Sequence, residues 1–337
     1  MPKIGFACKF IGNDSQISGV GSGDPEKALN TRSTTAAWCA RQYPSVAESR
    51  LWELMQYNIE SIRLLVSQVT TMPAPQRMVR LSSEILPLYT HHLWKDFWKR
   101  DDVQQYCARH FLAVGNIARA AGVRLSFHPG QFCVLASDRP EVVESSIEEF
   151  EYHADMARWM GYGQQFQDFK INVHIGGRLG PNGILATYER LSDVAKNTIT
   201  IENDENSWGL DSCLELAHRI PIVLDVHHHF VNTGEYISPT DSRVAQVVES
   251  WRGITPTMHL SQTRETFLTQ HCINTLPCKD ALLKAGVNKQ KLRAHSDYLW
   301  NSAVNEWALQ FLDKFDIMVE AKAKNLAASR FYQLTGL

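Results

Sequence analysis

The amino-acid sequence predicts an α/β protein built as a TIM (β/α)8-type barrel with long strand-to-helix loops. Two observations support this fold class. Eight short apolar runs alternate with segments of helical periodicity, and most of these runs end on a polar residue. The chain has 337 residues, which is enough for a barrel of roughly 250 residues with insertions. We therefore expect one barrel domain over residues 1–337.

The expected strands are short, apolar and partly β-branched. They cover residues 3–8, 77–82, 124–128, 170–174, 198–202, 222–225, 257–259 and 316–320. Their alternation with helices indicates a parallel sheet closed into a barrel. A doubly wound open sheet is the alternative, but such a fold normally has a glycine-rich phosphate loop directly after its first strand. The glycines of 19–23 lie well past the first strand, and we interpret them as a flexible loop.

Helical patterns fill the segments between these strands. Apolar residues recur at 3.6-residue spacing between positions 51 and 65, and a second such segment covers 103–121. An early proline, Pro140, and an acid in the first turn, Glu141, mark a helix that runs to about residue 160. Further helices are expected over 184–194, 210–219, 243–251, 303–315 and 326–334. Residues 9–45 and 263–294 are expected as long loops on the face where barrel active sites lie.

Composition excludes several classes of protein. The formal net charge is −2, which argues against a protein that coats nucleic acid but allows an enzyme with a local basic groove. Seven cysteines without C-x-x-C spacing disfavour a disulfide framework or a thiolate zinc site. We expect reduced cysteines in a cytoplasmic protein. No apolar run approaches the roughly 20 residues of a membrane span, so we expect none. Residues 1–6 are expected to start a strand, since they lack the long apolar stretch of a signal peptide.

Six of the eight expected strands end on a histidine or a carboxylic acid. These residues are His128, His174, Glu202, Asp225, His259 and Glu320. In a barrel such positions converge on one pocket. Crowded carboxylates resist ionisation, divalent cations relieve their repulsion, and neutral imidazoles add nitrogen ligands. One histidine or glutamate at a strand end is commonly structural, but six in equivalent positions predict a shared metal centre. Mixed nitrogen and oxygen donors suit Zn²⁺, Mn²⁺ or Fe²⁺ better than Ca²⁺.

Two further groups of histidines are candidates. His227, His228 and His229 follow Asp225 directly. Because side chains alternate along a strand, these three cannot all face one point, and we expect one or two of them to be ligands. His295 follows the long 263–294 segment. Alone it would be weak evidence for a metal ligand, and it is a candidate only because of the other His, Glu and Asp residues.

The motifs at these positions resemble those of the UV damage endonuclease family. The matching stretches, in family order, are RLSSEILP at 80–87, SFHPGQF at 126–132, HIGG at 174–177, IENDE at 201–205, DVHHH at 225–229, HLS at 259–261, HSD at 295–297 and VEAKAK at 319–324. They span most of the chain. HPGQ, ENDE and VEAK are specific in combination, although each alone is a weak signal.

The resemblance implies a TIM-like barrel shared with endonuclease IV and xylose isomerase, and two or three divalent ions, commonly Mn²⁺. It implies that the partner is UV-damaged double-stranded DNA, cut immediately 5′ to cyclobutane pyrimidine dimers and 6-4 photoproducts in DNA repair. We expect the enzyme to act as a monomer. Carried over by motif, the implied metal ligands are His128, His174, Glu202, Asp225, His228, His259, His295 and Glu320. His228 is preferred to His227 because the family pattern is D-x-x-H.

The resemblance also implies roles for other residues. Glu202 would be the bridging carboxylate, and Lys322 would add positive charge near the phosphate. Gln131 and Phe132 would probe the duplex where a dimer is displaced, because an aromatic ring can stack on bases. Arg80 is a candidate phosphate contact.

This chain departs from the family pattern at two positions of interest. Phe132 stands where a tyrosine is usual. Thr257 stands where members often have a lysine that can be carboxylated and touch the metals. Alternatives are an endonuclease IV-like enzyme acting at abasic sites, a xylose isomerase-like sugar isomerase, and an inactive barrel that binds damaged DNA. The Gln131-Phe132 pair and the ENDE stretch favour photoproduct repair, and metal-dependent nicking would exclude the inactive barrel.

Overall fold

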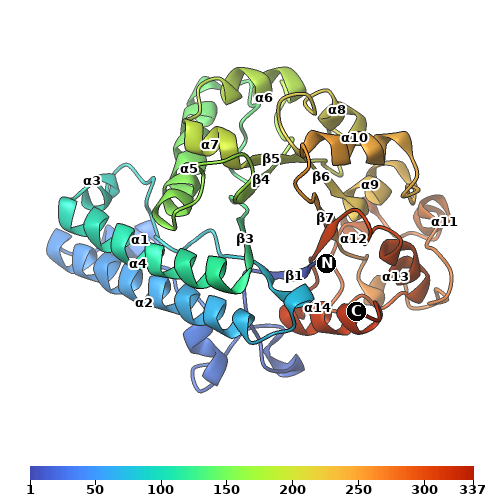
Figure 1. Cartoon of the computed structure of the whole chain (residues 1–337), viewed down its shortest axis with the longest axis horizontal. Helices are drawn as coiled ribbons and strands as arrows, with labels where there is room; N and C mark the ends of the chain where they lie inside the picture. Colours follow the sequence, from blue (N-terminus) through green and yellow to red (C-terminus); the bar gives the residue numbers. More distant parts are fainter.

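The computed structural model describes residues 1–337 and has a closed barrel of eight parallel strands surrounded by helices (Figure 1). The strands are β1 (Ile4–Ala7), β2 (Met78–Arg80), β3 (Arg124–Phe127), β4 (Lys170–His174), β5 (Ile199–Glu202), β6 (Ile222–Asp225), β7 (Thr257–Leu260) and β8 (Asp316–Val319). Each strand pairs with its neighbours in sequence, and β8 closes on β1. The predicted TIM-type barrel is confirmed.

The connections between strands carry most of the helices. The longer ones are α2 (Pro44–Thr70), α4 (Asp101–Ala121), α5 (Pro140–Trp159), α6 (Gly180–Tyr188), α9 (Val226–Thr233), α10 (Ser242–Ser250), α13 (Ser302–Leu309) and α14 (Lys324–Gln333). The shorter ones are α1 (Ala36–Cys39), α3 (Lys95–Trp98), α7 (Asp193–Thr198), α8 (Leu210–Leu214), α11 (Lys279–Lys284) and α12 (Lys289–Leu292), with the 3-10 helices η1 (Asp14–Gln16), η2 (Pro25–Leu29), η3 (Ala74–Gln76) and η4 (Glu265–Phe267). The long helices α2 and α4 pack side by side outside the barrel (Figure 1).

Several predictions of local structure were wrong. The single helix expected over 184–194 is two helices, because the Ser192 side chain accepts a hydrogen bond from the Ala195 amide and starts α7. The helices expected over 210–219 and 303–315 end early, at Leu214 and Leu309. The segments 9–45 and 263–294 were expected as loops but contain short helices.

His227, His228 and His229 lie on helix α9. The prediction that placed them on a strand with alternating side chains was wrong. The Asp225 side chain accepts a hydrogen bond from the His228 amide at 2.7 Å, so this aspartate caps α9 at its first turn. Consecutive residues of a helix point about 100° apart. The three histidine rings are therefore directed toward different surroundings.

The two faces of the barrel strands differ in chemistry. Outward residues such as Phe127, Ile171 and Ile201 are fully buried in the apolar layer between strands and helices. The interior is partly polar: Arg124 of β3 and Asp316 of β8 form an ion pair of 2.6 Å. Since β3 and β8 are not neighbours, this ion pair crosses the barrel interior. Buried polar groups destabilise a protein unless they are paired. Several buried His, Glu and Asp side chains gather at the carboxyl ends of the strands.

Two further findings concern the cysteines and the helices. All seven cysteines are free. None of the helices combines the length and the apolar character that crossing a membrane requires.

Candidate metal centre

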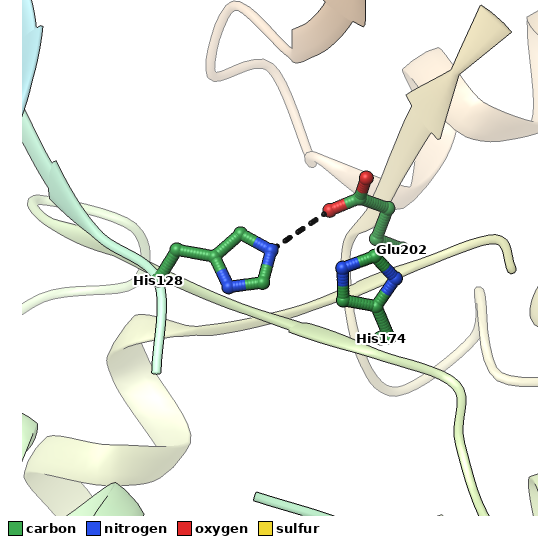
Figure 2. A group of neighbouring side chains, drawn as sticks. All are labelled: His128, His174 and Glu202. Carbon is green, nitrogen blue, oxygen red and sulfur yellow. Dashed lines mark ion pairs between the residues drawn. The ribbon is translucent and has the colours of Figure 1, made fainter. Parts of the chain in front are cut away.

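The carboxyl ends of six strands bring histidine and acidic side chains into one buried cluster. Register places His174 of β4 beside Glu202 of β5, and Asp225 of β6 beside His259 of β7. Three groups have ligand atoms within 4.8 Å of one another: His128, His174 and Glu202; Glu202, Asp225 and His228; and Asp225, His259 and Glu320. We call these seven residues the candidate metal centre. Figure 2 shows the first group, in which one ring nitrogen of His128 faces the Glu202 carboxylate.

Glu202 lies at the middle of the candidate metal centre and belongs to two of its groups. Its side chain is 1% exposed. The Oε2 atom is 3.3 Å from Nε2 of His128, and the Oε1 atom is 3.1 Å from Nδ1 of His259. The Asn172 side chain donates a hydrogen bond to Oε2 and holds the carboxylate in place. This position between two sets of histidines is what a bridging ligand requires.

Backbone carbonyls orient two of the histidine rings. Nδ1 of His128 is 2.9 Å from the Pro129 carbonyl oxygen, and Nδ1 of His228 is 3.0 Å from the Asn203 carbonyl oxygen. Because a carbonyl can only accept, Nδ1 must carry a hydrogen, so Nε2 is the nitrogen available to bind a cation. In His128 this nitrogen faces Glu202. Such a partner on the far nitrogen is the usual support of a metal-bound imidazole.

Several observations fit divalent cations. Asp225 Oδ2 and His259 Nδ1 are buried without a hydrogen-bond partner, and both residues belong to the group with Glu320. Burial raises the pKa of the Asp225 carboxyl well above its ordinary value, and the charges of Glu202 and Glu320 add to this effect. Burial also lowers the pKa of His259 to about 4, so the ring is neutral at pH 7 and can offer a lone pair. Imidazole nitrogens and carboxylate oxygens together suit a divalent transition metal.

Three predicted site residues lie beside the candidate metal centre and not in its groups. Burial lowers the pKa of His295, and the nearby Glu320 opposes this shift. Lys322 precedes α14, with Nζ 3.8 Å from Oδ1 of Asp297 and a side chain 38% exposed. Arg80 is largely buried, with a side chain 13% exposed, and pairs with Glu320. It therefore lies behind a predicted ligand, whereas a phosphate contact would have placed it on the open surface.

The other two histidines of the triplet have partners of their own. Nε2 of His227 is 3.1 Å from the Leu292 carbonyl oxygen. Nε2 of His229 is 2.9 Å from Oε2 of Glu235, on the side away from the ligand groups. Of the triplet, only His228 joins the candidate metal centre.

The loop after β3 carries the predicted DNA probe. Gln131 is exposed, and Phe132 is 85% exposed. The start of this loop is held in place by Ser83, whose hydroxyl donates to the His128 carbonyl. An aromatic side chain this exposed contributes little to folding, because it buries almost no apolar surface. It lies four residues from His128 of the candidate metal centre.

Sequence reasoning missed Lys170, which lies inside the barrel beneath the candidate metal centre. Its Nζ atom is 3.1 Å from Nε2 of His259, whose Nδ1 faces Glu202. Burial lowers the pKa of Lys170 to about 7. The available signal was strand parity, because Lys170, Asn172 and His174 alternate along β4 and share one face. In this chain a lysine of β4 contacts the β7 histidine. Thr257 of β7, which stands where family members often have a lysine, is buried and its hydroxyl has no hydrogen-bond partner.

For His259 to bind metal through Nδ1, its Nε2 must carry the hydrogen and donate it to the neutral amine of Lys170, whose pKa burial lowers to about 7. Replacing Lys170 with methionine is therefore expected to weaken divalent metal binding about 10- to 100-fold, the usual effect of losing the partner of a metal-binding histidine. The apolar chain of methionine fills similar space, so the fold should persist. Calorimetric titration of Mn²⁺ into chelator-stripped protein measures the effect. Thr257→Val, two residues from His259, is the matched control and should bind as the parent does. Parental affinity in Lys170→Met would show that this lysine does not support the ligand.

Known proteins resemble this chain in both sequence and structure. The family model of the UV-endonuclease UvdE matches residues 22–336. A UV DNA damage endonuclease of Bacillus cereus (strain 03BB102) is 26% identical over 308 residues, which cover 85% of this chain and 83% of that protein. The crystal structure of SacUVDE has a TM-score of 0.72 at 21% identity and covers 100% of this chain and 98% of its own. Endonuclease IV from Thermus thermophilus shares the fold, with a TM-score of 0.53 at 12% identity over 81% of this chain and 92% of that one. Because the family model spans nearly the whole sequence, this chain belongs to the UV-endonuclease UvdE family.

Proposed function

We propose that this protein cuts duplex DNA immediately 5′ to UV photoproducts, using divalent metals bound at the candidate metal centre. One observation carries the proposal: a buried cluster of His, Glu and Asp side chains lies directly beside an exposed aromatic loop. His128 belongs to the cluster and Phe132 to the loop, so ligand and probe share one short segment. Membership of the UvdE family and relatives named UV DNA damage endonuclease support the choice of substrate.

The proposed ligands are the seven residues of the candidate metal centre together with His295. We propose Mn²⁺ as the bound metal, with two or three ions, since carboxylate and imidazole donors suit it. When bound, such ions supply Lewis-acid stabilisation of the charge that develops on a phosphodiester during hydrolysis. Glu202 would bridge ions, and Arg80 would hold Glu320 in its ligating position. All proposed ligands come from one chain, so a monomer would suffice.

Two other side chains have proposed roles toward DNA. Phe132 would enter the duplex at the lesion and stack on bases that the dimer has displaced, and Gln131 would enter with it. Lys322 would place positive charge near the phosphate, since it is partly exposed and only two residues from Glu320. Its distance of 3.8 Å from Asp297 leaves the ammonium group free to turn toward an anion.

The test is an incision assay on a labelled duplex with one defined cyclobutane dimer, with Mn²⁺ present. The expected result is a nick directly 5′ to the dimer that disappears with chelator. Undamaged and abasic-site duplexes run beside it. Cutting only at the abasic site would replace the proposal with an endonuclease IV-like activity. No cutting of any duplex, with metal shown to be bound, would contradict a nuclease role.

A further inference from the structure

One long segment of this chain has a net positive charge. Residues 263–294, which we call the basic insertion, contain six basic residues and two acidic ones, a net charge of +4 in a chain whose total is −2. The basic residues are Arg264, Lys279, Lys284, Lys289, Lys291 and Arg293, and the acidic ones are Glu265 and Asp280. The remainder of the chain therefore carries −6. An asymmetry of this size indicates a surface for an anionic partner.

The fold places the basic insertion at the rim of the candidate metal centre. The chain leaves β7 just after His259 and returns just before His295, and an antiparallel bridge between Thr263 and His295 closes the base of the excursion. Arg293 Nη1 is 3.2 Å from Oε1 of Glu205, in the loop after β5. Both ends of the insertion are thus held at the carboxyl ends of the strands, where the proposed ligands lie.

The insertion is a packed element that can present charges in a fixed arrangement. Leu292 is fully buried and clusters with Phe230 and Val231 of α9. Lys279 Nζ is 2.5 Å from the Asn232 carbonyl oxygen, which ties α11 to the end of α9. Figure 1 shows α11 and α12 beside α9 and α13 at one edge of the barrel.

Most of its positive charge has no acidic partner. Within the insertion only Arg264 and Arg293 form ion pairs. Lys284, Lys289 and Lys291 are exposed and form none. Burial lowers the pKa of Lys279, and the charge of Lys289 lowers it further, whereas Asp280 raises it. Lys289 of α12 is thus near Lys279 of α11, and an anion bound beside the two would offset their repulsion.

The basic insertion and the loop that carries Phe132 lie on opposite sides of the barrel. In the closed order of eight strands, β3 and β7 stand four steps apart in either direction, so they lie on opposite sides of the barrel. Phe132 follows β3, and the basic insertion follows β7. A duplex that crosses the candidate metal centre and contacts Phe132 would reach the insertion on the far side.

We propose that the basic insertion is a second DNA-binding surface, which grips the phosphate backbone of the duplex on the side of the metal centre opposite Phe132. Lys284, Lys289 and Lys291 supply the contacts. The inference rests on the proposed function, because it takes duplex DNA as the molecule lying across the centre. The contacts are to phosphates, so they carry no lesion specificity and add equally to the binding of damaged and undamaged DNA.

The test compares the parent with the triple variant Lys284→Gln, Lys289→Gln, Lys291→Gln. A control of equal charge, Arg109→Gln, Arg252→Gln, Lys314→Gln, removes three positive charges from α4 and from the segments that precede β7 and β8. Because Arg252 and Lys314 donate to backbone carbonyls, the thermal midpoint of this control is compared with that of the parent before binding is measured. Fluorescence anisotropy measures binding of a photoproduct duplex and an undamaged duplex in EDTA over a series of salt concentrations. Each lost phosphate contact lowers the slope of log K against log salt by about 0.9, so a reduction of about 1 to 3 is expected in the triple variant. The control should keep the parental slope.

The outcomes separate this inference from the proposed function. An equal loss of affinity for both duplexes, with a reduced salt slope, would support the proposal that the basic insertion binds the phosphate backbone. A parental slope in the triple variant, or no duplex binding by the parent, would overturn it. Incision is scored separately with Mn²⁺ present. If the parent binds through the insertion but never cuts, only the proposed nuclease activity fails; if it cuts and the triple variant binds normally, only this inference fails.

Discussion

Glu202→Gln is expected to reduce incision roughly 10³-fold, equivalent to about 4 kcal/mol of transition-state stabilisation. Glu202 belongs to two of the three ligand groups and lies 3.3 Å from His128 and 3.1 Å from His259. Glutamine keeps the shape of the side chain but removes the charge that attracts two cations. Single-turnover incision rates and the amount of bound Mn²⁺ should fall together.

Burial opposes the charge of Glu202, but His259, His174 and the hydrogen bonds from His128 and His228 hold its pKa well below the ordinary value. Its charge therefore stabilises the metal-free fold, and the thermal midpoint of the variant in EDTA should fall. Circular dichroism at the assay temperature shows whether the variant is folded when incision is measured. Glu235→Gln is the matched control, since Glu235 also faces a histidine, His229, but lies outside the ligand groups. Its incision rate should stay within about twofold of the parent. If Glu202→Gln kept a tenth of the parental rate, Glu202 would not be the bridging ligand.

Phe132→Ala is expected to slow incision of a dimer-containing duplex about 10- to 100-fold. Base–aromatic stacking contributes roughly 1–3 kcal/mol per base, and each 1.4 kcal/mol is a factor of ten. The side chain is 85% exposed, so its removal should leave the thermal midpoint unchanged. Rates measured over a range of substrate concentrations would show whether the loss lies in lesion binding.

Two variants complete this experiment. Phe132→Tyr keeps the aromatic plane and should restore the rate to near the parental value. Tyr43→Ala removes an aromatic ring that is 82% exposed at the start of α2, and it should have no effect. Equal rates for Phe132→Ala and the parent would mean that the lesion is recognised by other residues.

The barrel was predictable because strand ends and helical periodicity are local features. His128, His174, Glu202 and Asp225 each terminate an apolar run, and parallel closure brings such ends together whatever the intervening loops do. This is why seven of the eight ligand candidates fall into the three groups. Helix boundaries were predicted less well, because caps such as Ser192 depend on single hydrogen bonds that periodicity does not reveal.

Other features depend on contacts between distant strands, which a single sequence does not display. Lys170 opens β4 and meets His259 of β7 only across the barrel interior. Arg80 was a candidate phosphate contact within the family resemblance, but it pairs with Glu320, which is far away in the sequence. The histidine triplet was assigned to a strand because the capping bond of Asp225, which starts α9, is formed within one turn and leaves no periodic pattern.

The central claim is that the candidate metal centre holds divalent ions. Anomalous diffraction at the manganese edge, from crystals soaked in Mn²⁺, tests it most directly. The account predicts at least two anomalous peaks, one among His128, His174 and Glu202 and one among Asp225, His259 and Glu320, each at bonding distance from its ligand atoms. Crystals that show manganese elsewhere on the protein but no peak at these residues would contradict it.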